Sequence, residues 1–164
     1  MFVIVMGVSS SGKSTVGQAL ALRLGLPFFD ADDYHSPENK AKMKSDHGLS
    51  DADRAPWLAR LATLAVESEA SGGAVLACSA LKQAHRDVLV AGVREHRIVY
   101  IELPRAIAEQ RLEKRRGKHP FIGDFAHFLA GQYRDLEPPQ GAIVIDGQRG
   151  EAEVIEQALR ALTH

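Results

Sequence analysis

Gly7-Val8-Ser9-Ser10-Ser11-Gly12-Lys13-Ser14 follows directly after the apolar run Phe2–Met6. The spacing of its two glycines and of the Lys-Ser pair matches the phosphate-binding P-loop, in which backbone N–H groups and the N-terminus of the next helix converge on phosphate oxygens. The alternative is an ordinary glycine-rich turn that holds no nucleotide. A strand before the loop and a helix after it are the context that the motif requires, so the stretch predicts a nucleoside triphosphate site.

The loop residues have separate expected roles. Lys13 should reach the β- and γ-phosphates, and the Ser14 hydroxyl is placed to bind Mg²⁺, with Thr15 beside it as a second hydroxyl. Nucleotide contacts are predicted for Gly7, Ser9, Ser10, Ser11, Gly12, Lys13, Ser14 and Thr15, and for Arg111 further along the chain.

Length and composition limit the remaining possibilities. The 164 residues suit a single domain, 1–164, that is large enough to bury a core. Lys plus Arg total 20 against 21 Asp plus Glu, so no broad basic surface favours a nucleic-acid partner. No apolar run approaches the ~20 residues of a membrane span. The single Cys78 and a chain that begins with a strand indicate a reducing, cytoplasmic setting without a membrane partner.

Apolar runs of strand length alternate with segments of helical period, which predicts an α/β fold. Strands are expected at Phe2–Met6, Pro27–Phe29, Ala74–Cys78, Arg97–Ile101 and Ala142–Ile145, and helices at Lys13–Leu24, Pro37–Lys44, Pro56–Ser71, Gln83–Gly92, Pro104–Arg116, Phe125–Leu136 and Glu151–Leu162. Nearly continuous apolar strands joined by helices indicate a parallel sheet of about five strands covered on both faces, with ligands beyond the carboxyl ends of the strands.

The second expected strand ends in Asp30-Ala31-Asp32, followed by His35. Two carboxylates two residues apart in extended chain point the same way. We assign Asp32 to an acceptor hydroxyl as general base, and we assign Asp30 to Mg²⁺ through a bridging water. The alternative is a solvated acidic turn that caps the next helix. His35 is expected to contact substrate, although a lone loop histidine is often only surface.

The third expected strand ends in Cys78-Ser79-Ala80-Leu81-Lys82, where many P-loop ATPases have a metal-binding acid. The lack of an acid here favours a small-metabolite kinase over a motor or a switch, with Ser79 and Lys82 facing the substrate. Cys78 is expected to be a small buried hydrophobe, since nothing around it suggests an activated thiolate.

Two basic features are expected at the site. Arg54, at the start of a helix, has the fork geometry to hold a substrate carboxylate, against the alternative of a surface salt bridge. Asp51 or Asp53 is expected to be an N-cap there, and Trp57 is expected to lie in the core.

Arg111 and Arg115 share a helix face at the edge of a predicted lid, about 113–130, whose arginines would close over the transferring phosphate. The alternative is a solvated helix C-terminus.

The order of these motifs resembles the bacterial gluconate kinases of the thermoresistant type, small P-loop kinases similar in fold to shikimate kinase. The resemblance rests on the P-loop, Asp30-Ala31-Asp32 with His35, Asn39 through Met43, Leu49 through Leu58, and Cys78 through Lys82 followed by Arg86-Asp87. It departs from the family pattern at Ser10, where a second loop glycine is usual, and at His85, where Tyr is usual.

The resemblance implies a three-layer αβα P-loop kinase fold with a helical lid. It also implies ATP- and Mg²⁺-dependent phosphorylation of D-gluconate to 6-phosphogluconate, which would feed the pentose phosphate pathway or the Entner–Doudoroff route. Such enzymes are often homodimers. Lys13, Asp32 and Arg115 would be catalytic, with a substrate region at about 30–60. Another small hydroxy acid such as shikimate is the alternative substrate. A nucleotide-dependent switch is a further alternative, but the Asn-Lys pair at 39–40 falls too early for guanine recognition.

Overall fold

The computed structural model describes residues 1–44, 48–115 and 125–164, with the side chains of Lys44 and Phe125 excepted. Its strands form one five-stranded parallel sheet in the order β2-β3-β1-β4-β5. They are β1 (Phe2–Met6), β2 (Phe28–Asp30), β3 (Ala74–Ala77), β4 (His96–Glu102) and β5 (Ile143–Asp146). Because all strands are parallel, their carboxyl ends meet along one edge of the sheet.

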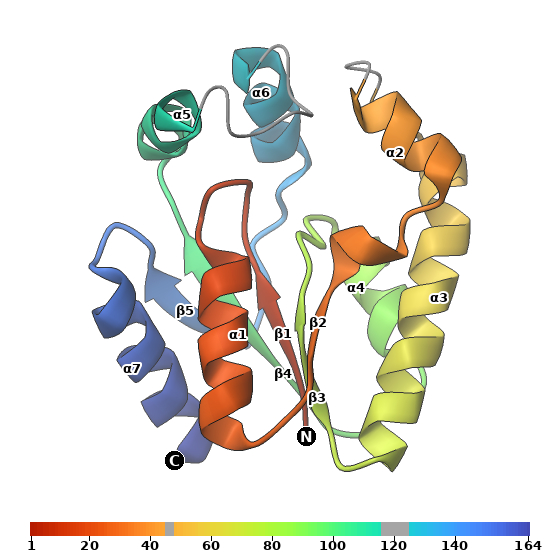
Figure 1. The fold of residues 1–164 in the computed structure, drawn as a ribbon, viewed down its shortest axis with the longest axis vertical. Coiled ribbons are helices and arrows are strands. Elements are labelled where there is room, and N and C mark those ends of the chain that lie inside the picture. The colour runs from red at the N-terminus through yellow and green to blue at the C-terminus, as the bar shows by residue number, and fades with distance from the viewer. Residues whose placement is uncertain (45–47, 116–124) are drawn as a thin grey trace.

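Helices cover both faces of this sheet (Figure 1). One face packs against α1 (Lys13–Leu24) and α7 (Glu151–Thr163), and the other against α3 (Asp51–Ala70) and α4 (Gln83–Val90). A short 3₁₀ helix η1 (Ala31–Tyr34) and the helices α2 (Pro37–Lys44), α5 (Arg105–Lys114) and α6 (Phe125–Asp135) lie beyond the carboxyl ends of the strands. The predicted three-layer α/β arrangement is confirmed.

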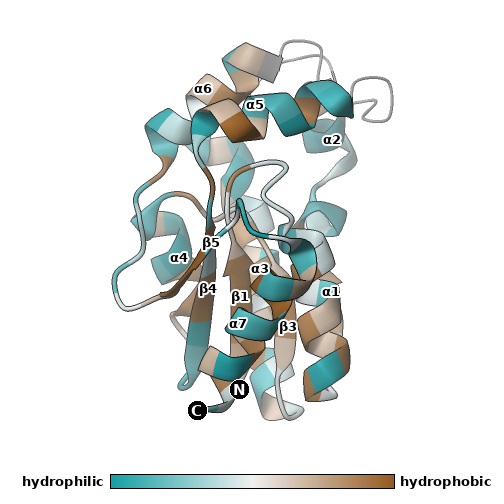
Figure 2. Ribbon diagram, turned by 90° about the vertical axis from the view of Figure 1, so that its left-hand side faces the viewer, coloured by the Kyte–Doolittle hydropathy of each residue, from teal (hydrophilic) through white to brown (hydrophobic). Residues whose placement is uncertain are grey.

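Strand β1 shows why the fold has three layers. Successive side chains of a strand point to opposite faces. Phe2, Ile4 and Met6 join the core beneath α3 and α4, whereas Val3 and Val5 join the core beneath α1 and α7. All five of these side chains are fully buried. Figure 2 shows hydrophobic strand segments lying between the helices.

The predicted start of the third helix at Pro56 is wrong, because α3 begins at Asp51. Ser50 is its N-cap and accepts a hydrogen bond from the Asp53 backbone N–H, while the Asp53 carboxylate accepts one from the Ser50 N–H. This reciprocal capping box satisfies the first turn. The N-cap is therefore Ser50, and not Asp51 or Asp53 as predicted, although the Asp53 side chain completes the capping box. The other predicted boundaries within the described residues differ from the structure by at most two residues.

None of the helices in the described part of the chain combines the length and the apolar character needed to cross a membrane.

Candidate active site

The P-loop connects β1 to α1, and its two glycines are required for different reasons. A Cβ on Gly7 would lie 2.5 Å from the Ser11 hydroxyl oxygen and 3.0 Å from the Ile101 carbonyl oxygen, so a side chain there would force these neighbours to shift. Gly12 has open space around it, but its φ of +91° is a left-handed conformation that favours glycine. Close packing at Gly7 and backbone conformation at Gly12 therefore shape the loop.

Ser10 also adopts a left-handed backbone, with φ of 62°. This conformation is uncommon for a residue with a side chain. The Ser10 hydroxyl donates hydrogen bonds to the Ser9 carbonyl at 2.6 Å and to the Ala108 carbonyl in α5 at 3.1 Å. The serine thus takes the conformation that glycine adopts readily, and its side chain holds the loop against α5.

Two distant side chains support the loop. The Ser9 backbone N–H donates a 2.7 Å hydrogen bond to the Gln132 side-chain oxygen on α6. Arg111 donates to the Ser10 carbonyl at 3.3 Å and to the Gly147 carbonyl, beyond β5, at 2.7 Å. Arg111 was predicted to contact nucleotide; in the structure its guanidinium braces the P-loop against the loop that follows β5. Sequence reasoning missed Gln132, since no local motif marks it.

Asp30 links the P-loop to the tip of β2. Its carboxylate accepts a 2.8 Å hydrogen bond from the Ser14 hydroxyl and a 3.0 Å hydrogen bond from the Asp32 backbone N–H. The second bond makes Asp30 the N-cap of η1, as in the capping alternative, and the assignment of Asp30 to Mg²⁺ stays a prediction. The adjacent hydroxyl and carboxylate oxygens are ligands that Mg²⁺ prefers, and the pair predicted for metal therefore fits that ion.

Asp32 and Lys13 lie close to this pair. Asp32 is exposed and Lys13 is half-buried. Burial and the charges of Asp32, Lys13 and Asp30 shift the pKa of the Cys78 thiol, which lies fully buried just after β3. Burial is the main cause that raises the pKa of this thiol to about 12, and the negative charge of Asp32 comes next. Cys78 is thus the inert, buried residue that was predicted.

His35 is buried at 7% exposure, which excludes the alternative of a surface loop histidine. Its ring stacks on Trp57 at 4.3 Å between centroids, and the Trp57 indole N–H donates to the Ala31 carbonyl at 2.7 Å. Burial, then the positive charges of Arg54 and Lys40, lower the pKa of His35 to about 4. His35 is therefore uncharged near neutral pH, and its Nδ1 atom has no hydrogen-bond partner among the described residues.

Arg54 and Lys82 come together around a carboxylate of the chain itself. One carboxylate oxygen of Asp51 lies 3.9 Å from an Arg54 nitrogen, 3.7 Å from the Lys82 ammonium and 3.6 Å from His85 Nε2. The alternative of a salt bridge for Arg54 is thus realised. Ser79 is half-buried on the same connection as Lys82. The sequence marks His85 only as a departure from the family pattern and does not predict its contact with Asp51.

Arg86 fixes the turn that carries Ser79 and Lys82. It is 1% exposed and donates to the carbonyls of Ala80 at 2.8 Å, Leu81 at 2.9 Å and Glu137 at 2.8 Å. Ala80 has a φ of 39°, another left-handed residue in the turn. Arg86 therefore ties the end of β3 to the segment between α6 and β5.

The predicted lid, 113–130, is described only at its two ends. Arg115 is exposed and is the C-cap of α5. Residues 116–124 lie outside the described residues. Helices α5 and α6 pack through Leu112 and Leu129, both fully buried, so the two ends of the segment are in contact above the P-loop.

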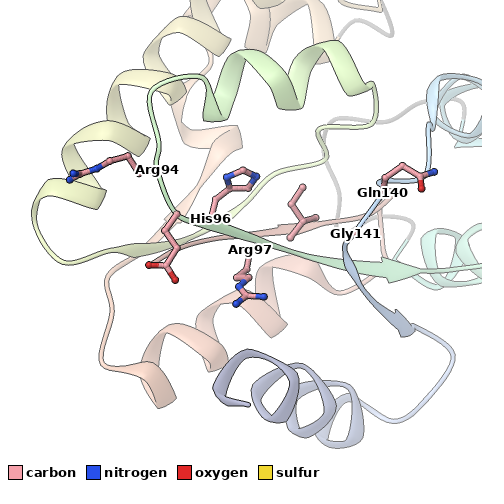
Figure 3. Close-up of a pocket in the computed structure, with 7 residues that line it drawn as sticks. Arg94, His96, Arg97, Gln140 and Gly141 are labelled. Carbon is pink, nitrogen blue, oxygen red and sulfur yellow. The ribbon is translucent and has the colours of Figure 1, made fainter.

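Two open hollows appear on the described surface. One of about 350 Å³ lies beside the predicted substrate region, between α2 and α3, and is lined by Tyr34, Ser36, Glu38, Asn39, Ala52, Asp53, Pro56, Trp57 and Arg60. The other, of about 360 Å³, lies at the amino end of β4, the opposite edge of the sheet from the P-loop. In Figure 3, Arg94 and Arg97 beside this second hollow point in different directions.

Comparisons with known proteins show the family to which this chain belongs. Residues 9–162 match the family model described as "Shikimate kinase". The gluconokinase of Gluconobacter oxydans (strain 621H) is 39% identical over 163 residues, which cover 97% of this chain and 89% of that protein. A probable gluconokinase of Mus musculus is 56% identical over 91 residues, which cover 55% of this chain and 50% of that protein.

The chain spans about half the length of the rodent and frog relatives that it matches. Among solved structures, a gluconokinase from Sinorhizobium meliloti 1021 superposes with a TM-score of 0.88 at 36% identity, covering 99% of this chain and 91% of that chain.

Proposed function

The chain belongs to the shikimate kinase family of P-loop kinases, in which its near-full-length relatives are gluconokinases, and from this premise we propose that it is a gluconokinase. The reaction is transfer of the γ-phosphoryl group of ATP to the terminal hydroxyl of D-gluconate, which forms 6-phospho-D-gluconate. The hydrogen bond between Ser14 and Asp30 is the observation that carries the proposal, because it joins a phosphate-binding loop to an acidic strand tip.

The nucleotide side consists of the P-loop. The P-loop residues Gly7, Ser9, Ser10, Ser11 and Gly12, the start of α1 and Thr15 surround the phosphates, and the Lys13 ammonium binds the β- and γ-phosphate oxygens. Mg²⁺, when bound with ATP, neutralises charge on the phosphates. Ser14 and Asp30 are the residues that hold it. Arg111 keeps the loop against the segment that follows β5.

The acceptor side consists of residues from about 30–60 and from the end of β3. Asp32 orients the gluconate hydroxyl and accepts its proton. Arg54 and Lys82 bind the carboxylate, while His35 and Ser79 bind hydroxyl groups. Arg115, with the lid, neutralises charge on the transferring group. Most of the rate acceleration in this arrangement comes from positioning and electrostatics.

We also propose the cellular setting and the assembly of the protein. The chain acts as a single P-loop kinase domain, works in the cytoplasm as a homodimer and supplies 6-phosphogluconate to the pentose phosphate pathway. Size-exclusion chromatography with light scattering tests the oligomer, and a monomer at assay concentration contradicts it.

The reaction is tested by ADP formation with ATP, Mg²⁺ and a panel of acceptors. D-gluconate should support turnover well above the rate without acceptor, and shikimate and the uncharged D-glucitol should not. Preference for shikimate would favour the alternative that the name of the family model suggests. Turnover of ATP that is independent of any acceptor would overturn the assignment as a small-molecule kinase.

A further inference from the structure

Three groups that can donate hydrogen bonds to an anion converge on one oxygen atom. The Asp51 oxygen lies 3.9 Å from Arg54, 3.7 Å from Lys82 and 3.6 Å from His85. These groups come from the first turn of α3 and the start of α4, two helices that pack together on one face of the sheet. The arrangement shows that the space among the three groups accepts a carboxylate.

The carboxylate is the exposed member of this cluster. The side chain of Asp51 is 75% exposed, whereas those of His85, Arg54 and Lys82 are 14%, 27% and 32% exposed. The donors thus form the inner wall, and the carboxylate approaches from the solvent side. An ion pair whose carboxylate lies exposed to water contributes little to stability, so another carboxylate can replace this one at small cost.

Asp51 is also not needed to start its helix. Ser50 and Asp53 form the capping box of α3, and the Asp51 side chain takes no part in it. The Asp51 side chain can therefore rotate away without loss of the cap. The inner wall is more firmly held, because Arg86 fixes the turn that precedes α4.

Resting on the proposed function, we propose that Asp51 occupies the place of the substrate carboxylate in the empty protein, that D-gluconate displaces it, and that His85 is a third ligand of that carboxylate. Asp51 is then a built-in competitor. Its negative charge offsets the repulsion between the positive charges of Arg54 and Lys82. An acid binds at this place only if its affinity is high enough to displace Asp51. An uncharged polyol cannot replace it.

Burial and the charge of Arg54 lower the pKa of His85, and the hydrogen bond and charge of Asp51 oppose this shift. His85 is therefore mainly uncharged near neutral pH. A neutral imidazole still donates one N–H to a carboxylate. Arg54 and Lys82 supply the positive charge that attracts a carboxylate, and His85 adds a hydrogen-bond donor.

The first test is Asp51→Asn, which keeps the shape and removes the charge. The KM for D-gluconate should fall by about threefold or more, the magnitude of an exposed ion pair, while kcat and the KM for ATP stay nearly unchanged. The matched control is Glu151→Gln, which removes an exposed acid from the same first position of a helix, in α7. The control should leave the KM for D-gluconate unchanged.

The second test is His85→Phe, which keeps a ring but removes the donor. The KM for D-gluconate should rise by about fivefold, as for loss of one hydrogen bond to a charged group, with a smaller change in kcat. In the double variant with Asp51→Asn the two effects should be less than additive, since both residues compete for or bind the same group.

The outcomes separate this inference from the function on which it rests. Wild-type protein that does not phosphorylate D-gluconate overturns both. Wild-type protein that does so, with an Asp51→Asn variant whose KM is unchanged or higher, overturns only the inference. A His85→Phe variant with wild-type KM removes His85 from the carboxylate site.

Discussion

The Ser14 hydroxyl donates a 2.8 Å hydrogen bond to the Asp30 carboxylate, although Ser14 follows β1 and Asp30 ends β2, and these two strands are not neighbours in the sheet. Strand β3 lies between β1 and β2, and α1 packs across it. This packing is close at Gly17, where a Cβ would lie 2.8 Å from the Phe28 ring. The small residue lets α1 approach β2, and the approach brings the hydroxyl to the carboxylate.

Asp30→Asn should weaken the use of Mg²⁺. The substitution removes a negative charge beside Ser14, so the Mg²⁺ concentration for half-maximal ADP formation should rise by about 10-fold or more. Titration of Mg²⁺ at saturating ATP and D-gluconate measures the effect. Asp33→Asn, at an exposed neighbouring acid, is the control and should keep the wild-type Mg²⁺ dependence. An unchanged titration for Asp30→Asn contradicts the metal assignment.

Asp32→Asn should separate nucleotide binding from phosphoryl transfer. Loss of a general base lowers kcat by about 10² or more. Binding of a non-hydrolysable ATP analogue, measured by calorimetry, should be retained because the exposed Asp32 side chain is not part of the P-loop. Near-normal kcat in this variant would remove Asp32 from the catalytic role.

Arg86→Met should destabilise the fold. The buried guanidinium serves the carbonyls of Ala80, Leu81 and Glu137, which methionine would leave unpaired. We expect a loss of about 3 kcal/mol in the free energy of unfolding, measured by urea denaturation. The matched control is Arg94→Met, since the Arg94 side chain is 92% exposed and should matter by less than about 0.5 kcal/mol. Equal stabilities of the two variants would contradict the role of Arg86.

His35 should make stability depend on pH. Its pKa is lowered to about 4 in the folded protein, from an ordinary value of 6.5. The unfolded chain therefore binds a proton at higher pH than the folded chain does. The contribution is fully present above pH 6.5 and is lost as the pH falls towards 4, with a slope of up to ~1.4 kcal/mol per pH unit.

Urea denaturation between pH 4 and 7 measures this slope, and comparison with His35→Gln isolates the part that belongs to His35. The variant should show a shallower decline on acidification. Parallel curves for the two proteins would mean that His35 is protonated equally in the folded and unfolded states.

Local patterns predicted the parts of this structure that are coded by neighbouring residues. The P-loop, β1, α1 and α2 were predicted with their observed bounds, because glycines, apolar runs and a first-turn proline mark them directly. The start of α3 was missed because Pro56 was taken as the helix start. The Ser50-x-x-Asp53 pattern of the capping box was present in the sequence and would have found it.

Contacts between distant segments could not be predicted in the same way. Gln132 reaches Ser9 from 123 residues away, and Arg111 reaches Ser10 from 101 residues away. The spatial order of the strands decides such contacts, and single-residue patterns do not encode it. Likewise, nothing in the sequence placed His85 beside Asp51, since that contact needs α3 and α4 to pack together.

The bridge that Arg111 forms between the Ser10 and Gly147 carbonyls has a consequence for the thermodynamics of nucleotide binding. Two loops that would otherwise have to be ordered by the incoming nucleotide are already tied to each other. Less conformational entropy is then lost on association, because a preorganised pocket has fewer arrangements to give up.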